Sequence, residues 1–230
     1  MNEQLTEKLN QARLLKRHFK LAETIEVLKE CLLIDPDCLI ASAQAGLCLL
    51  LSGDASQASV FFQKAYDGSG KSDVQVGAYL TACLTATGDE KAPALLNEIK
   101  ERHSDFSAAE TFMLASEMLS EKKQHEQAVR LIDALSTKFG QDDFFILPIN
   151  HYRLIRVLAA AELVDIAEPL AEALKQKTAG RWEGLAAEAS VAIAKKQYDE
   201  AYSLTVRALQ NGGTSYPLLA AQQHWLAINK

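Results

Sequence analysis

Histidine is the residue that most often serves as a metal ligand or proton carrier near neutral pH, and here its copies are few and scattered. The five histidines stand in five different parts of the sequence: His18, His103, His125, His151 and His224. None forms the HxxxH or HExxH spacing that places two ligands on one face of a helix. The histidines therefore predict no metal site and no cofactor.

The four cysteines are Cys31, Cys38, Cys48 and Cys83, and each lies among apolar residues of an expected helix. They form no CxxC pair, and no histidine stands at ligand spacing from them. A cysteine in apolar surroundings behaves as a small hydrophobic residue. We therefore expect all four to be buried, without redox or metal chemistry.

Two short motifs could suggest catalysis but lack the context that catalysis needs. Residues 68–72, Gly-Ser-Gly-Lys-Ser, end like a phosphate-binding loop. That loop requires an earlier glycine and a preceding strand, whereas position 65 is alanine and the segment before it is helical in pattern. Asp142 and Asp143 precede an apolar run, where helix capping is the commoner use of aspartate. We predict that the chain is not an enzyme.

The formal net charge of −6 argues against DNA or RNA as a partner, because phosphate contacts need clustered lysine and arginine. One segment, residues 8–20, is an exception. It contains no acidic residue and five basic ones: Lys8, Arg13, Lys16, Arg17 and Lys20. This basic segment is either a solvated helix face or a site for an anion or an acidic partner.

No part of the sequence is expected to insert into a membrane or to direct secretion. The first seven residues are polar and acidic, where a signal peptide is basic and then apolar. The longest uncharged run, residues 38–53, is too short to span a bilayer and contains Ser42, Gln44 and Ser52. We therefore expect a cytoplasmic protein.

The sequence repeats itself with a period of 34 residues, and each unit predicts two helices. Residues 39–51 form the expected first helix of the clearest unit, and Gly53-Asp54 ends it. In the second helix, residues 55–66, small and aromatic residues are spaced by four and three and share one face: Ala58, Phe62 and Ala65. The same face recurs 34 residues earlier in Thr24, Leu28 and Cys31.

The pattern continues downstream and predicts six helix pairs in all. The matching residues of the last three pairs are Ala128, Ile132 and Leu135, then Ala167, Ala171 and Leu174, then Ala201, Thr205 and Ala208. Extra residues between Ala128 and Ala167 fall at 140–147, where a boundary between two sub-arrays could lie. We favour one continuous solenoid over residues 1–230, closed by a capping helix at 216–228. No segment alternates with period two, so no strand is expected.

This pattern resembles the tetratricopeptide-repeat family, whose signature is small, small, aromatic or large, small, and then proline. The signature residues of the clearest unit are Gly46, Ala58, Phe62 and Ala65, and those of the preceding unit are Ala12, Thr24, Leu28, Cys31 and Pro36. The resemblance implies an all-α, right-handed solenoid of about six antiparallel helix pairs plus a C-terminal capping helix. It also implies that the chain binds other polypeptides.

In the family, the first helix of each pair lines the concave surface. The resemblance therefore implies that a partner contacts residues on the first helices, namely Arg13, Ala43, Leu47, Leu50, Tyr79, Ala82, Met113, Glu117, Tyr152, Arg153 and Arg156. Leu47 and Leu50 belong to an apolar stripe that begins at Ile40. That stripe either forms the floor of a groove or packs against neighbouring first helices.

Three functions from different classes are compatible with these patterns. The leading one is an adaptor, scaffold or chaperone-like protein that holds a peptide or helix in its groove. The second is a structural subunit that forms a homo-oligomer through residues 144–147 or through Trp225 and Leu226. The third is an enzyme on a repeat scaffold, with a site built from residues distant in sequence.

Overall fold

The protein is all-helical over the part that the computed structural model describes, which is residues 3–102, 105–138, 144 and 147–229. Within this part no residue belongs to a β-strand, so the predicted all-α class is confirmed. The chain divides into two compact units, residues 1–139 and 140–230. A single continuous solenoid over the whole chain stays a prediction.

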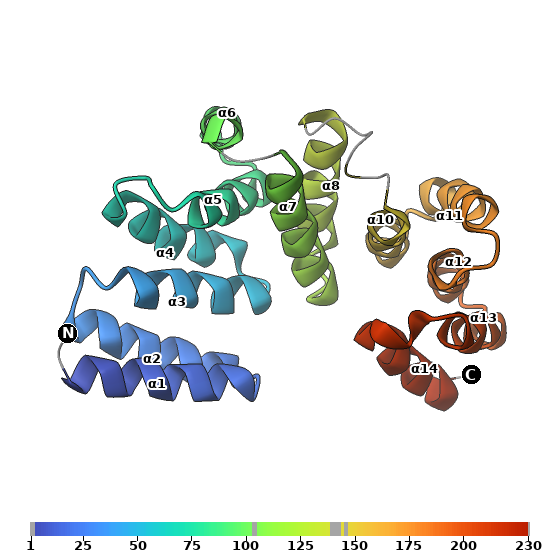
Figure 1. Ribbon diagram of the computed structural model, residues 1–230, viewed down its shortest axis with the longest axis horizontal. Helices are drawn as coiled ribbons and strands as arrows, with labels where there is room; N and C mark the ends of the chain where they lie inside the picture. Colours follow the sequence, from blue (N-terminus) through green and yellow to red (C-terminus); the bar gives the residue numbers. More distant parts are fainter. Residues whose placement is uncertain (1–2, 103–104, 139–143, 145–146, 230) are drawn as a thin grey trace. The chain divides into compact units, whose positions relative to one another are not determined.

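The first unit holds four helix pairs (Figure 1). They are α1 (Glu3–Arg17) with α2 (Leu21–Ile34), α3 (Leu39–Leu51) with α4 (Ala55–Gly68), α5 (Val74–Thr87) with α6 (Ala92–Arg102), and α7 (Asp105–Glu121) with α8 (His125–Lys138). α2 packs against α3 as well as α1, and α4 packs against α5 as well as α3. α5 in turn packs against both α7 and α8, so the pairs share one core within this unit.

The second unit holds two helix pairs and a closing helix. They are α10 (Pro148–Ala160) with α11 (Val164–Thr178), α12 (Trp182–Ala194) with α13 (Tyr198–Gln210), a 3₁₀ turn η1 (Gly213–Ser215), and α14 (Pro217–Asn229). α12 packs against α10, α11 and α13, and α14 covers α13 at the end of the unit (Figure 1). The described helices thus confirm six pairs and a final unpaired helix.

The residues that define the repeat form the core of each pair. Ala58, Phe62 and Ala65 are buried, and so are their counterparts Thr24, Leu28, Cys31, Ala128, Ile132, Leu135, Ala167, Ala171, Leu174, Ala201, Thr205 and Ala208. A Cβ atom on Gly46 would lie 3.0 Å from the Phe62 ring. Such a contact is tighter than most real Cβ contacts, so a side chain at this position would force the Phe62 ring to shift.

The turn inside each helix pair has the same backbone hydrogen bonds in all six pairs. One residue in the left-handed conformation donates its N–H to the carbonyl three residues before it, and the next residue donates to the carbonyl five residues before itself. This is the Schellman motif, in which glycine is the preferred left-handed residue. The six left-handed residues are Phe19, Gly53, Gly88, Lys123, Glu162 and Lys196.

All four cysteines are buried, as expected, and none of them forms a disulfide. Burial raises the pKa of the Cys31, Cys48 and Cys83 thiols, which keeps them protonated near neutral pH. No group of three or more histidine, cysteine and carboxylate side chains that could hold a metal ion occurs among the described residues. No helix in that part of the chain is long and apolar enough to cross a membrane.

Candidate peptide-binding groove

A groove in the first unit opens between α1 and α3, the first helices of two successive pairs. α2 packs against both helices and contributes to the floor of this α1–α3 groove. The groove has a volume of 440 Å³, within the range of about 300–1,000 Å³ that is typical of ligand sites.

The groove is elongated along α1. Its lining residues on this helix extend from Thr6 to Lys16, a distance of about 15 Å at the helical rise of 1.5 Å per residue. This length accommodates about three turns of a bound helix, or four to five residues of an extended chain. The shape therefore fits a polypeptide segment better than a compact metabolite.

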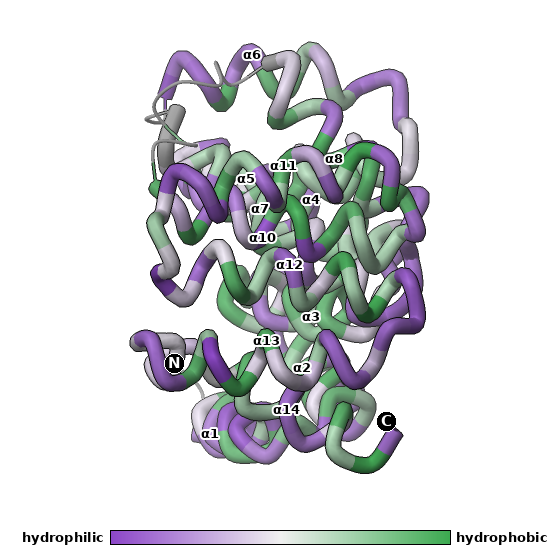
Figure 2. Tube along the Cα trace, turned by 90° about the vertical axis from the view of Figure 1, so that its right-hand side faces the viewer, coloured by the Kyte–Doolittle hydropathy of each residue, from purple (hydrophilic) through white to green (hydrophobic). Residues whose placement is uncertain are grey.

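Apolar side chains form the floor and walls of the groove. Ala12 and Leu28 are buried beneath it, while Leu9 is half-buried and Ile40 is 62% exposed at its sides. The α3 side of the groove belongs to a helix without charged residues, whereas α1 contains both charged and apolar residues, like most helices of the chain (Figure 2). Covering an exposed aliphatic side chain such as Ile40 stabilises a complex by about 1.5–3 kcal/mol, before the costs of association.

The two cations that line the groove donate hydrogen bonds to neighbouring amide side chains. Arg13 donates from Nη2 to Asn10 Oδ1 at 3.2 Å, and Lys16 donates from Nζ to Gln44 Oε1. Because both amide oxygens already accept a hydrogen bond, the amide NH₂ groups of Asn10 and Gln44 are left to donate to a ligand. Cations and amide NH₂ groups together suit carboxylates and backbone carbonyls.

The structure separates the basic segment into paired and unpaired cations. Lys8 pairs with Glu30 at 2.5 Å, a hydrogen bond that raises the pKa of Lys8, and Lys20 pairs with Glu23 at 3.3 Å. Arg13, Lys16 and Arg17 pair with no carboxylate among the described residues. Two of these three unpaired cations, Arg13 and Lys16, line the groove.

Of the predicted partner-binding residues, Arg13 alone lines the groove. Ala43 and Leu47 lie half-exposed on α3, and Tyr79 is half-buried with its ring stacked on Phe62 at 5.4 Å. The predicted set left out the groove residues Thr6, Asn10 and Gln44. Lys16 belongs to the basic segment, and Ile40 begins the apolar stripe of α3, so the sequence had marked both as possible binding residues.

The prediction of partner contact is wrong for Leu50, Ala82, Met113 and Tyr152, whose side chains are all 0% exposed. α3 and α5 have no charged residue, and a helix that is apolar on all sides is usually buried on most of them. Tyr152 packs edge-on against the rings of Trp182 and Tyr216, at 5.5 and 5.4 Å. These four residues serve the core.

Three other predicted residues are not among those that line the groove. Glu117 and Arg153 are buried, and Arg153 donates to Asn150 Oδ1 at 3.4 Å, while Arg156 is half-buried. Partner contact by these three residues stays a prediction.

Of the residues proposed for self-association, two are buried and two are exposed among the described residues. Leu226 is buried, so this part of the prediction is wrong, because the residue packs in the second unit's core. Trp225 is partly exposed, with its ring edge-on to Tyr198 at 5.7 Å. Phe144 is buried and Leu147 is exposed, whereas residues 145 and 146 lie outside the described residues.

A second hollow, of 610 Å³, lies in the second unit between α11, α12 and α13. Its lining carries five carboxylates, from Asp165, Glu168, Glu172, Glu188 and Glu200, and one lysine, Lys195. Lys195 pairs with Glu168, and Lys175 pairs with Glu188 at 2.7 Å. The charge of this acidic hollow is opposite to that of the α1–α3 groove.

No protein-family model and no curated protein sequence matches this chain. Among solved structures, the chain is similar to a crystal structure of the TPR domain of P58(IPK), with a TM-score of 0.40 and 13% sequence identity. The similarity covers 98% of this chain and 65% of that one, so the chain spans about two thirds of the length of that domain.

Proposed function

We propose that the chain binds a polypeptide segment in the α1–α3 groove and thereby acts as an adaptor, scaffold or chaperone-like protein, without a catalytic step. The observation that supports this function is the groove itself, which combines an elongated apolar channel with the unpaired cations Arg13 and Lys16. Grooves of this form bind amphipathic helices or extended peptides through apolar anchors.

The chemistry of the groove favours a segment that is both apolar and acidic. Apolar anchors against Leu9 and Ile40 would supply most of the affinity. Carboxylates on the same segment would pair with Arg13 and Lys16 and would mainly set its orientation and association rate. Ala43 and Leu47, half-exposed on α3, would extend the contact along that helix.

A random-peptide display selection on the full chain tests this proposal. We expect the enriched peptides to combine aspartate or glutamate with leucine, isoleucine or phenylalanine. Ile40→Asp should then lower the affinity for the best enriched peptide about tenfold, because it places a carboxylate among the apolar anchors of an acidic ligand. The melting temperature should stay unchanged, since Ile40 is largely exposed.

Leu33→Asp is the matched control, because Leu33 is an 83% exposed leucine on α2 that does not line the groove. This variant should bind the peptide like the wild type. Equal affinity in Ile40→Asp and the wild type would contradict the proposal. So would the absence of any enriched peptide, or an enrichment of lysine and arginine, which would point instead to the acidic hollow of the second unit.

A further inference from the structure

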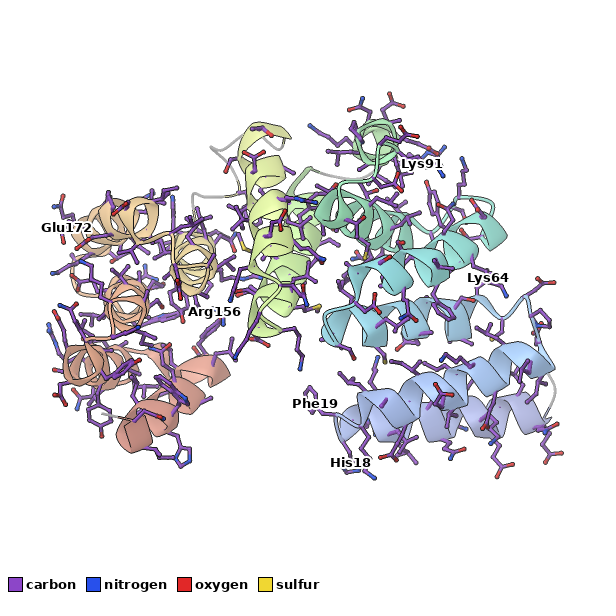
Figure 3. The ribbon with its side chains drawn as sticks, turned by 180° about the vertical axis from the view of Figure 1, so that it is seen from behind. His18, Phe19, Lys64, Lys91, Arg156 and Glu172 are labelled. Carbon is purple, nitrogen blue, oxygen red and sulfur yellow. The ribbon has the colours of Figure 1, made fainter. Side chains whose placement is uncertain are left out.

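Phe19 occupies the left-handed position of the turn between α1 and α2, with φ of 55°. Its side chain is 80% exposed and projects away from both helices (Figure 3). A left-handed conformation is strained for a bulky residue, and here no buried contact of the ring compensates for it.

The other five turns of the same geometry present no apolar side chain. Two have glycine, Gly53 and Gly88, and three have the charged residues Lys123, Glu162 and Lys196. Since these residues form the same hydrogen bonds as Phe19, the turn itself does not require an aromatic ring.

Phe19 lies next to the basic end of the α1–α3 groove. Lys16, which lines the groove, precedes it by three residues, less than one helical turn of about 5 Å. Arg17 lies between them, without an ion pair among the described residues, and no acid occurs from Lys8 to Lys20. The exposed ring therefore directly follows the unpaired cations in the chain, and the Phe19 N–H donates to the Lys16 carbonyl oxygen at 3.0 Å.

We propose that Phe19 is an aromatic anchor for an acidic polypeptide segment bound in the α1–α3 groove, an inference that rests on the function proposed above. An apolar side chain of the segment packs on the ring, while its carboxylates meet Arg13, Lys16 and Arg17. A polypeptide fits these cations better than an anionic bilayer does, because Arg13 and Lys16 line a groove that a flat surface cannot enter.

Affinity and stability measured together on three variants test this inference, with the best enriched display peptide as the probe. Phe19→Lys introduces the residue found at the equivalent positions 123 and 196, and it removes the ring. We expect it to bind the peptide about tenfold more weakly, as for loss of an interface anchor. Its melting temperature should stay unchanged, because the ring is exposed.

Phe19→Gly should lower the affinity for the peptide to the same degree. The melting temperature of this variant should stay the same or rise, because glycine relieves the strain of the left-handed conformation. Phe19→Tyr, which keeps the ring, should bind like the wild type. Weaker binding by a protein of equal or higher stability would show that the ring serves binding rather than folding.

Three outcomes would overturn the inference. Wild-type peptide affinity in Phe19→Gly, with Ile40→Asp still weakened, would exclude the anchor and leave the groove intact. A clear loss of melting temperature in Phe19→Lys would assign the ring to packing. The third outcome concerns membranes. The wild type would sediment with phosphatidylserine vesicles but not with phosphatidylcholine vesicles, and Phe19→Lys would lose this sedimentation while its peptide affinity stayed unchanged. That result would assign the ring to a bilayer.

Discussion

Replacing Gly184 by valine is expected to lower the free energy of unfolding of the second unit by about 3 kcal/mol. A Cβ atom at this position of α12 would lie 2.8 Å from the Cα atom of Lys175 and 2.6 Å from Thr178 Oγ1. The Lys175 contact is with helix backbone, which cannot rotate away as a side chain can, so α11 and α12 would have to separate. Thermal unfolding followed by circular dichroism should show a lower melting temperature.

Gly68→Val is the matched control, because it also introduces a side chain at a helical glycine. Its Cβ atom would meet only the Leu39 side chain, with Cδ2 at 2.4 Å and Cγ at 3.8 Å, and that side chain can move. We expect a loss of less than about 1 kcal/mol. Equal losses in the two variants would show that α11 and α12 do not pack as closely as the structure has them.

Removal of α14 by deleting residues 214–230 is expected to lower the free energy of unfolding of the second unit by more than about 5 kcal/mol and to cause aggregation. α14 covers α13 with the buried Leu219 and Leu226, and Gln222 donates to Thr205 Oγ1 at 2.8 Å. Without this helix the apolar face of α13 would be exposed to solvent, and exposed patches of this kind promote association. Thermal unfolding and light scattering on the truncated chain measure both effects.

Two point variants in α14 test whether its buried side chains provide the stability. Leu226→Ala should cost about 2–5 kcal/mol, because the leucine is fully buried. Ile228→Ala, at a 70% exposed residue of the same helix, should cost less than about 0.5 kcal/mol. A stable, monomeric truncated chain would contradict the role of α14 as the cap of the second unit.

The fold could be predicted from the sequence because the spacing of the small and apolar residues and the positions of the helix-ending glycines indicate the same helices. The expected helix at residues 39–51 has the bounds of α3, Leu39–Leu51, since Gly53 adopts the left-handed conformation that ends it. The triplet Ala58, Phe62 and Ala65 is buried as its spacing indicates. Local rules suffice here, because each pair repeats one packing geometry.

The binding residues were less predictable, for two physical reasons. α3 has no charged residue, so nothing in its sequence marks a solvent face, and Leu50 was placed there although it is buried. The groove also depends on contacts between helices far apart in sequence. The hydrogen bond from Lys16 to Gln44 joins residues 28 positions apart, which no local pattern reveals.

The acidic hollow of the second unit was missed for a similar reason. Asp165, Glu168 and Glu172 are spaced by three and four on α11, which does place them on one helical face. Glu188 and Glu200 join them from α12 and α13, and only the packing of three helices brings these carboxylates to one hollow. A charged helix face in a sequence is more often a solvated surface than the wall of a cavity.

Photo-crosslinking tests most directly the claim that a polypeptide binds between α1 and α3. With p-benzoylphenylalanine in place of Ile40, irradiation should join the best enriched display peptide covalently to the chain, and mass spectrometry should place the bond at position 40. The same residue in place of Leu33, an even more exposed leucine on α2, should give no crosslink. Crosslinking at position 33 but not at position 40, or at neither position with a peptide that still binds, would contradict the assignment of the groove.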